Sequence, residues 1–237
     1  MQVLDGNVEK DIIEWDSVNW AKFLTFIDES EIDFQGKKVL AIGERNGGMS
    51  LFFALKGAEV FCTDCSGPTE KAHALHKKYG VDSQIQYAAV NAVNISEKYN
   101  GQFDIVTFKS VLGGIGLNNN YEAQEQCVAS IDRVLKRKGF CVFAENMRGS
   151  LIHAGLRRAF VSWGGTWHYE TDEEITELFH RFHLIRMQKF GVLGALGRNE
   201  PQRRALGKLD TMIFDKLLPD TSKYIGAYLF QKNDAMC

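Results

Sequence analysis

A glycine-rich turn and an acid behind it are the first residues of the chain that could bind a ligand. Residues 43–48, Gly-Glu-Arg-Asn-Gly-Gly, directly follow the short apolar run 37–42. Asp64 ends the next apolar run, 58–64, and stands 21 residues after Gly43. Glycines let a ligand approach the backbone of such a turn, and a carboxylate can accept hydrogen bonds from both hydroxyls of a ribose. The spacing therefore predicts a nucleoside site.

Arg45 helps to decide which cofactor such a site could hold. A dinucleotide needs glycine at the middle of G-x-G-x-x-G, because backbone must approach the pyrophosphate there. Arg45 occupies this position, and its side chain would obstruct the phosphates. A nucleoside without phosphates is less demanding, so the turn favours one over NAD(P). A tight turn between a strand and a helix, without any ligand, is the alternative to both.

Basic and aromatic side chains gather in two later segments, 146–170 and 191–219. Together these segments hold eight Lys or Arg and four Asp or Glu, a balance of +4, so the rest of the chain carries −6 toward the net charge of −2. Arginine forks bind carboxylate or phosphate, and aromatic faces stack on flat or sugar-like surfaces. We expect Arg157, Trp167, Arg203 and Arg204 to contact a substrate, with a solvated helix face and core aromatics as the alternative.

Two histidines of the first segment could take a proton from a substrate hydroxyl, because imidazole titrates near neutrality. His168, between Trp167 and Tyr169 after a glycine pair, is the first candidate, and His153 is the second. A histidine in such a loop is often structural, and that alternative stays open.

Cysteine and histidine pairs elsewhere favour structural roles. Cys62 and Cys65 form a C-x-x-C pair, but Cys62 should point into the sheet, which favours packing over redox chemistry. His73 and His76 lie three residues apart with no third ligand in view, so we expect solvated surface there and no metal site.

Strands that alternate with helices must position these residues. Apolar periodicity predicts strands at 37–42, 58–64, 84–90, 103–108, 139–145, 183–190 and 223–231, and helices at 8–29, 49–56, 69–79, 121–138 and 172–181. This alternation predicts an α/β fold with a mostly parallel sheet and helices on both faces. Ligands of such folds bind beyond the carboxyl ends of the strands.

Composition indicates an ordinary globular protein. The 237 residues are 45% hydrophobic and 24% charged, which fits one domain over 1–237. The 28 Lys or Arg and 30 Asp or Glu do not favour nucleic acid as a partner. Five cysteines are too few for a disulfide framework, so we expect a reducing, cytoplasmic setting. No leader or apolar span is evident, and we expect no membrane partner.

The motif series VLAIGERNGG, EVFCTD, NAVNI and FDIVTFKSVL resembles, in order and spacing, the class I S-adenosylmethionine-dependent methyltransferases. The resemblance covers 37–145 by motif. It implies a Rossmann-like, doubly wound sheet of seven strands, mostly parallel with an antiparallel last strand, and S-adenosylmethionine as methyl donor. By position, it implies that the cofactor is bound by Gly43, Glu44, Arg45, Gly47, Asp64, Cys65, Asn91, Ala92, Lys109 and Ser110.

Two positions depart from the pattern of that family. Ala41 stands where the family has an acid, and Arg45 stands where it has a second glycine. We expect Glu44 to supply the missing carboxylate toward the cofactor's ammonium, with Arg45 facing outward or paired with an acid.

These observations predict an O-methyltransferase for a small polar or anionic acceptor, such as a saccharide or another hydroxyl-bearing metabolite. Within it we expect a helical cover at 1–36, a cofactor core at 37–145, and acceptor segments at 146–170 and 191–219, the second acting as a mobile lid. A noncatalytic cofactor- or partner-binding protein and an NAD(P)-dependent oxidoreductase are the alternatives.

Overall fold

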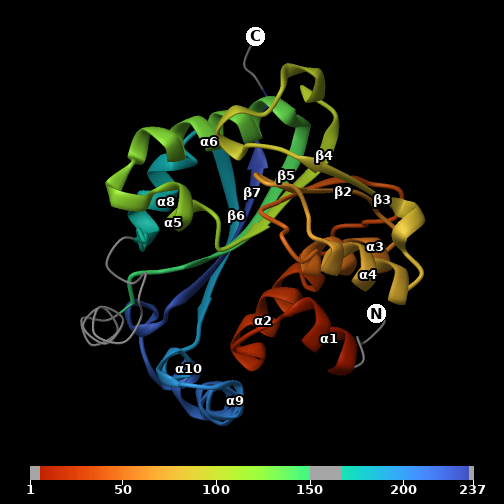
Figure 1. Cartoon of the computed structure of the whole chain (residues 1–237). Coiled ribbons are helices and arrows are strands. Elements are labelled where there is room, and N and C mark those ends of the chain that lie inside the picture. The colour runs from red at the N-terminus through yellow and green to blue at the C-terminus, as the bar shows by residue number, and fades with distance from the viewer. Residues whose placement is uncertain (1–5, 150–166, 235–237) are drawn as a thin grey trace.

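Seven strands form one sheet in the computed structural model, which describes residues 6–149 and 167–234 (Figure 1). The strand order is β3-β2-β1-β4-β5-β7-β6. Strands β1 to β5 run parallel, whereas β7 pairs antiparallel with both β5 and β6. The predicted mostly parallel sheet with an antiparallel last strand is confirmed. The strands are β1 Lys38–Ile42, β2 Glu59–Asp64, β3 Ile85–Ala89, β4 Phe103–Lys109, β5 Leu135–Asn146, β6 Phe182–Phe190 and β7 Ile225–Lys232.

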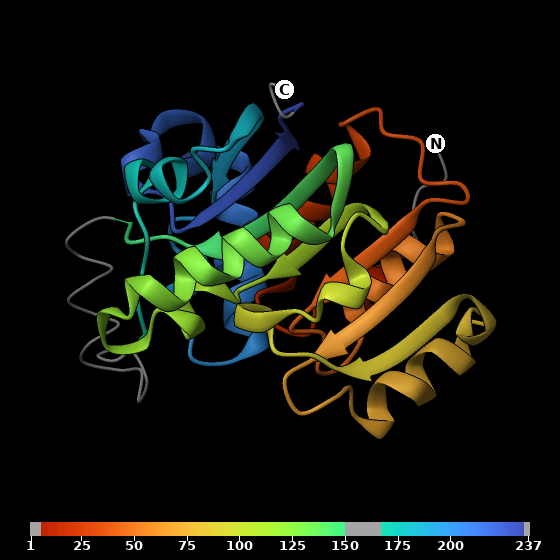
Figure 2. The same ribbon diagram turned by 90° about the horizontal axis from the view of Figure 1, so that it is seen from above.

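Helices cover both faces of this sheet (Figures 1 and 2). One face carries α1 Gly6–Ile12, α2 Ser17–Asp28, α3 Gly48–Leu55 and α4 Glu70–Lys78; the other carries α5 Leu112–Ile115, α6 Tyr121–Val134 and α8 Asp172–Leu178. Beside α2 lies a continuous helical stretch made of α9 Glu200–Leu209, a π-helical turn Asp210–Phe214 and α10 Asp215–Leu217. Among the described residues, no helix combines the length and apolarity that a bilayer span requires.

Each face of the sheet has its own apolar core. Trp20, Phe23 and Phe52 are fully buried between the first group of helices and the sheet. On the opposite face the Phe143 ring stacks on Phe108 with ring centroids 4.4 Å apart, within a larger group of buried aromatic rings from β5, α8 and β7. Burial on both faces explains why the strands read as nearly continuous apolar runs.

The carboxyl ends of six strands meet at one edge of the sheet. Strands β1, β2, β3 and β4 end there at Ile42, Asp64, Ala89 and Lys109. Asn146 of β5 and Phe190 of β6 both stand in register with Ile225, the first residue of β7. Segments 146–170 and 191–219 therefore leave the sheet at the same edge as the glycine-rich turn, as expected.

The predicted helix over 8–29 is wrong in one respect, because residues 13–16 break it into α1 and α2. Asp16 adopts the left-handed backbone conformation with φ of 45°, and its N–H donates to Glu200 Oε2 at 2.8 Å. The periodicity of Trp20, Phe23 and Ile27 continues through α2. A contact with a residue 184 positions away thus overrides the local helix pattern.

The predicted helix over 121–138 ends earlier than expected, at Val134. Leu135 joins β5 opposite Phe103, and Lys138 has a positive φ of 57°. Leu135 and the residues after it pair with β4 in an irregular register, so they form part of strand β5 and not of the helix.

Candidate active site

The glycine-rich turn after β1 has a backbone that only glycine fits at two positions. Gly43 and Gly47 have φ of 69° and 79°, in the region that side chains rarely adopt. A Cβ on Gly43 would lie 2.5 Å from Val111 Cγ2, and one on Gly47 would lie 2.5 Å from His76 Nε2. Val111 and His76 therefore pack against the turn, and the turn places backbone atoms at the carboxyl edge of the sheet.

His76 supports this turn from α4, and the expectation of solvated surface is wrong for it. The ring is buried, with Nε2 2.8 Å from the Gly47 carbonyl oxygen and Nδ1 2.8 Å from the Tyr87 hydroxyl. A carbonyl oxygen only accepts, so Nε2–H donates to it. Burial lowers the pKa of His76, and its neutral ring accepts from Tyr87 at Nδ1. His73 is exposed, as expected.

Glu44 lies beneath the turn. Its side chain is buried, and Oε2 accepts a hydrogen bond of 2.9 Å from the Ser50 N–H in the first turn of α3. Burial raises the pKa of this carboxyl. The observed role of Glu44 is to cap α3, and its contact with a cofactor ammonium stays a prediction. Arg45 is exposed and pairs with no acid in the described part of the chain.

Asp64 ends β2 with one carboxylate oxygen free. Oδ1 accepts from the Ser66 N–H at 3.1 Å and from Cys65 Sγ at 3.5 Å. Within residues 6–149 and 167–234, Oδ2 accepts no hydrogen bond. Cys62 is buried in the sheet and Cys65 is exposed, as expected. The free oxygen can accept from a ligand.

Asn91 and Ala92 follow β3 at the same edge. Asn91 is exposed, and its Oδ1 accepts from the Val93 N–H at 3.0 Å, which begins a short 3-10 turn, Ala92–Asn94. Ala92 is buried. The amide nitrogen of Asn91 makes no hydrogen bond in the described structure, so it can serve a ligand.

Lys109 and Ser110 close β4. The Lys109 ammonium lies 4.8 Å from the centroid of the Trp20 ring. Burial lowers the pKa of Lys109, while the carboxylates of Glu44 and Glu14 raise it. Ser110 has a positive φ of 55°, and its hydroxyl accepts from Asn146 Nδ2 at 2.8 Å. The Lys109 ammonium thus stands among acids at the end of the central strand.

Glu145, which sequence patterns did not single out, holds the segment after β4. Its Oε1 accepts from the N–H groups of Val111 and Leu112, both at 2.7 Å. Burial raises the pKa of Glu145 to about 7. Glu170 lies near it, hydrogen-bonded to Gln124 at 2.7 Å, and burial raises its pKa to about 9. For Glu145, the only signal in the sequence is an acid within an otherwise apolar predicted strand.

His168 lies beside α5, the short helix that follows the carboxyl end of β4. It is 7% exposed, its ring packs edge-on against Tyr121 at 5.0 Å, and Nε2 lies 3.7 Å from Glu174 Oε2. Its N–H donates to the Gly113 carbonyl at 3.2 Å. His168 is thus packed among α5, α6 and α8, and its role as a base stays a prediction beside the structural alternative.

Trp167 covers α5 from the same side. A Cβ on Gly113 would lie 2.1 Å from Trp167 Nε1, so the two segments approach closely. The other two candidates in this segment, His153 and Arg157, lie outside the described residues.

Arg203 and Arg204 point in different directions from α9. Arg203 is partly buried, with its guanidinium carbon 5.7 Å from the centroid of the Trp15 ring. Arg204 is exposed and contacts no acid in the described structure. The structure therefore does not bring these two predicted substrate residues together.

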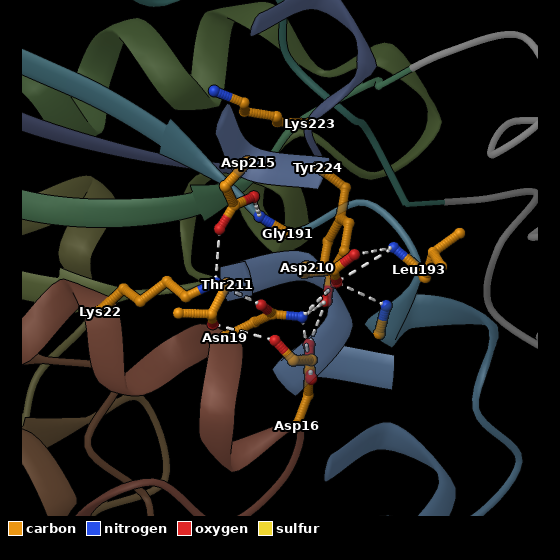
Figure 3. Close-up of polar contacts among 12 residues, drawn as sticks. Asp16, Asn19, Lys22, Gly191, Leu193, Asp210, Thr211, Asp215, Lys223 and Tyr224 are labelled. Carbon is orange, nitrogen blue, oxygen red and sulfur yellow. Dashed lines mark hydrogen bonds and ion pairs between the residues drawn. The ribbon is translucent and has the colours of Figure 1, made fainter. Parts of the chain in front are cut away.

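Four buried polar side chains join α2, the π-helical turn and the start of β7 (Figure 3). Asn19 Nδ2 donates to Asp210 Oδ2 at 2.9 Å and to the Tyr224 hydroxyl at 3.0 Å. The Tyr224 hydroxyl donates to Asp16. Burial raises the pKa of Asp16 to about 7. This network anchors both ends of segment 191–219 to the helical cover.

The chain is similar to known methyltransferases in part of its sequence. Residues 40–143 match a family model described as a methyltransferase domain. Over 84 residues the chain is 31% identical to the ubiquinone biosynthesis O-methyltransferase of Acinetobacter baylyi, a match that covers 35% of each chain. The matched segment thus spans about a third of that enzyme's length.

Solved structures extend the similarity to most of the fold. Phosphoethanolamine N-methyltransferase 2 of Haemonchus contortus, in complex with S-adenosyl-L-methionine, superposes with a TM-score of 0.64 at 17% identity, covering 91% of this chain and 53% of that one. A SAM-dependent methyltransferase of Methanosarcina mazei superposes with a TM-score of 0.60 at 18% identity, covering 87% and 97%. The sheet order and these superpositions show that the chain has the fold of the class I S-adenosylmethionine-dependent methyltransferases, and residues 40–143 within it match a methyltransferase domain.

Proposed function

We propose that this chain transfers a methyl group from S-adenosylmethionine to a hydroxyl of a small polar acceptor. The carboxyl edge of the sheet carries the proposal, since it joins a glycine turn, the free carboxylate oxygen of Asp64 and the Lys109 ammonium. The O-methyltransferase name of the Acinetobacter baylyi relative supports oxygen as the accepting atom.

The residues at this edge fit the cofactor. The backbone of the turn from Gly43 to Gly47 would lie along it, since the Cβ positions of both glycines face Val111 and His76 of the fold itself. Asp64 Oδ2 would accept from the ribose hydroxyls, Cys65 and Ala92 would flank the adenine, and Asn91 would face its amino group. Lys109 would pair with the methionine carboxylate, next to Ser110. When bound, this cofactor supplies an electrophilic methyl group on a sulfonium.

Charge at the site suits a cationic sulfonium. The carboxyl groups of Glu14, Asp16, Glu44 and Glu145 act on the Lys109 ammonium. Above about pH 7, where Asp16 and Glu145 ionise, the acids outnumber the Lys109 ammonium, so the local field favours a positively charged ligand over a neutral one. Binding of the charged methyl donor would then exceed binding of its neutral product.

The chain's own contribution to methyl transfer is mainly alignment. In-line displacement needs the acceptor oxygen, the methyl and the sulfur held collinear, and positioning of this kind can supply several kcal/mol, on the order of ~7. Arg203 beside Trp15, Trp167 over α5, and Arg157 are the residues that we propose to hold the acceptor. His168 and His153 are the histidines that we propose as candidates for the base.

A calorimetric titration with S-adenosylhomocysteine tests the cofactor assignment. We expect Asp64→Ala to weaken binding by roughly 5- to 150-fold, because charge-assisted hydrogen bonds of about 1–3 kcal/mol are lost. Asp82→Ala, at an exposed position before β3, is the matched control and should bind as the parent does. An unchanged dissociation constant for Asp64→Ala would reject the site, and tighter binding of NAD would favour the oxidoreductase alternative.

Methyl transfer itself is tested with S-adenosylmethionine carrying a labelled methyl group and fractionated cell extract. We expect label to enter a small-molecule fraction with the parent chain and not with Asp64→Ala. The second candidate function is a noncatalytic binding protein, because the Glu44 carboxyl is hydrogen-bonded to the first turn of α3 and Ala41 has no carboxyl group. Tight binding of S-adenosylhomocysteine without transfer to any fraction would favour it.

A further inference from the structure

The helical stretch 200–217 presents an exposed stripe made of two adjacent rows. One row is Arg204, Lys208, Met212 and Lys216, and the other is Ala205, Leu209, Ile213 and Leu217; all eight are exposed. Met212 is 59% exposed and Leu217 is 75% exposed. Rows of residues four apart lie side by side on a helix. The stripe is therefore apolar along one row and mainly basic along the other.

The opposite side of the same helices is fixed to the protein. Gly207 and Asp210 are buried, and a Cβ on Gly207 would lie 2.9 Å from Val18 of α2. Asp210 accepts from the N–H groups of Leu193 and Gly194. The outward direction of the stripe is thus set by buried contacts, and its apolar row is exposed because no described residue covers it.

The stripe is positive because the acids of this stretch are engaged elsewhere. Glu200 accepts from the N–H groups of Asp16 and Ser17, Asp210 is buried, and Asp215 pairs with Lys22. Arg204, Lys208 and Lys216 form no ion pair with any described residue. The exposed charge of the stripe is therefore entirely basic.

We propose that this stripe docks the protein onto an anionic lipid surface. A helix with an apolar row next to basic residues lies flat at a membrane interface, with the apolar side chains in the acyl boundary and the cations near the phosphates. A second copy of the chain is a less suitable partner. A two-fold contact would place the three cations of the stripe opposite the same three cations of the other copy. Nucleic acid would leave the apolar row uncovered.

Docking in this way goes beyond the proposed methyl transfer and does not depend on it. The stripe lies on the segment between β6 and β7, which leaves the sheet at the edge that holds Asp64 and Lys109. Lipid binding would therefore bring the acceptor side of the fold to the membrane surface.

Flotation of the full chain with lipid vesicles tests the proposal. We expect the chain to float with phosphatidylcholine vesicles that contain phosphatidylglycerol and not with phosphatidylcholine alone, and added salt should release it. Lys208→Gln with Lys216→Gln should lower the partition coefficient by about thirtyfold, since each cation near an anionic surface contributes about fivefold. Ile213→Ser with Leu217→Ser should also prevent flotation.

Matched variants at other exposed positions control for the loss of cations or of apolar side chains outside the stripe. Lys10→Gln with Lys77→Gln removes two exposed cations elsewhere, and Ile185→Ser with Met187→Ser removes two apolar residues that are 47% and 40% exposed on β6. Both should float as the parent does. The proposal would be overturned if the chain floats equally well with neutral vesicles or does not float at all. It would also be overturned if the control variants lose as much flotation as the stripe variants. A stable dimer in sedimentation velocity that Ile213→Ser with Leu217→Ser dissociates would overturn it as well.

Discussion

Glu145 shows what one buried carboxylate does for the segment that follows the central strand. A single oxygen accepts from two consecutive backbone N–H groups, of Val111 and Leu112, and so fixes the backbone next to Lys109 and Ser110. Val111 in turn packs against Gly43 of the glycine turn. This carboxylate thus connects the ends of β1, β4 and β5.

We expect Glu145→Ala to lower the free energy of unfolding by roughly 2–3 kcal/mol, because two buried N–H groups lose their acceptor. Glu145→Gln keeps an acceptor oxygen at the same place and should lose about 1 kcal/mol or less. Urea unfolding of both variants gives the comparison. Equal losses in the two variants would mean that the hydrogen bonds to Val111 and Leu112 are not what the carboxylate contributes.

At the scale of elements, Asn19 links α2 to the helical stretch beside it and to β7. Its amide nitrogen donates to Asp210 and Tyr224, and its oxygen accepts from Lys22 at 2.8 Å. Lys22 belongs to α2 itself, whereas Asp210 and Tyr224 come from segments that are distant in sequence. Segment 191–219 is therefore anchored at its base, and the predicted lid motion would have to carry α2 with it or break this contact.

We expect Asn19→Ala to destabilise the chain by roughly 2–3 kcal/mol, since the carboxylates of Asp16 and Asp210 would lose a shared donor. Limited proteolysis should then cut 191–219 faster than in the parent. Asn100→Ala, at an exposed turn, serves as the matched control for urea unfolding and proteolysis. Unchanged cleavage of Asn19→Ala would show that this network does not hold the segment.

At the scale of the whole molecule, buried acids set how stability depends on pH. Burial raises the pKa of Asp16 and of Glu145 to about 7. The folded chain therefore keeps protons near pH ~5 to 6 that the unfolded chain has released, so stability falls as the pH rises toward about 7. This direction is opposite to that of a carboxylate stabilised by an ion pair.

We expect Asp16→Asn to flatten this dependence, because asparagine resembles the protonated acid and tolerates the left-handed backbone at this position. Between about pH 5 and pH 7, the parent should lose roughly 2 kcal/mol more stability than the variant. Urea unfolding at several pH values measures the difference. Asp82→Asn, at an exposed position, should keep the slope of the parent; the same slope in Asp16→Asn would disprove the assignment.

Local sequence was sufficient for the order of the elements and for the residues that lie at the carboxyl edge of the sheet. The glycine turn, Asp64 and Lys109 each follow an apolar run, and parallel strands bring such positions to one edge by topology. Helix 8–29 and helix 121–138 were predicted with wrong bounds because Asp16 and Leu135 are held by distant partners. Boundaries that depend on a tertiary contact have no local pattern to reveal them.

The sequence by itself determined the alternation of strands and helices and the residues at the strand ends, since both follow from apolar periodicity and spacing. Only the tertiary structure decided that His76 supports the turn, that His168 is packed among helices, and that Arg203 and Arg204 diverge. It also decided that the acids of 200–217 are engaged within the fold while Arg204, Lys208 and Lys216 face outward. The physical reason is that burial and pairing depend on contacts such as Asn19 with Asp210, which join residues 191 positions apart.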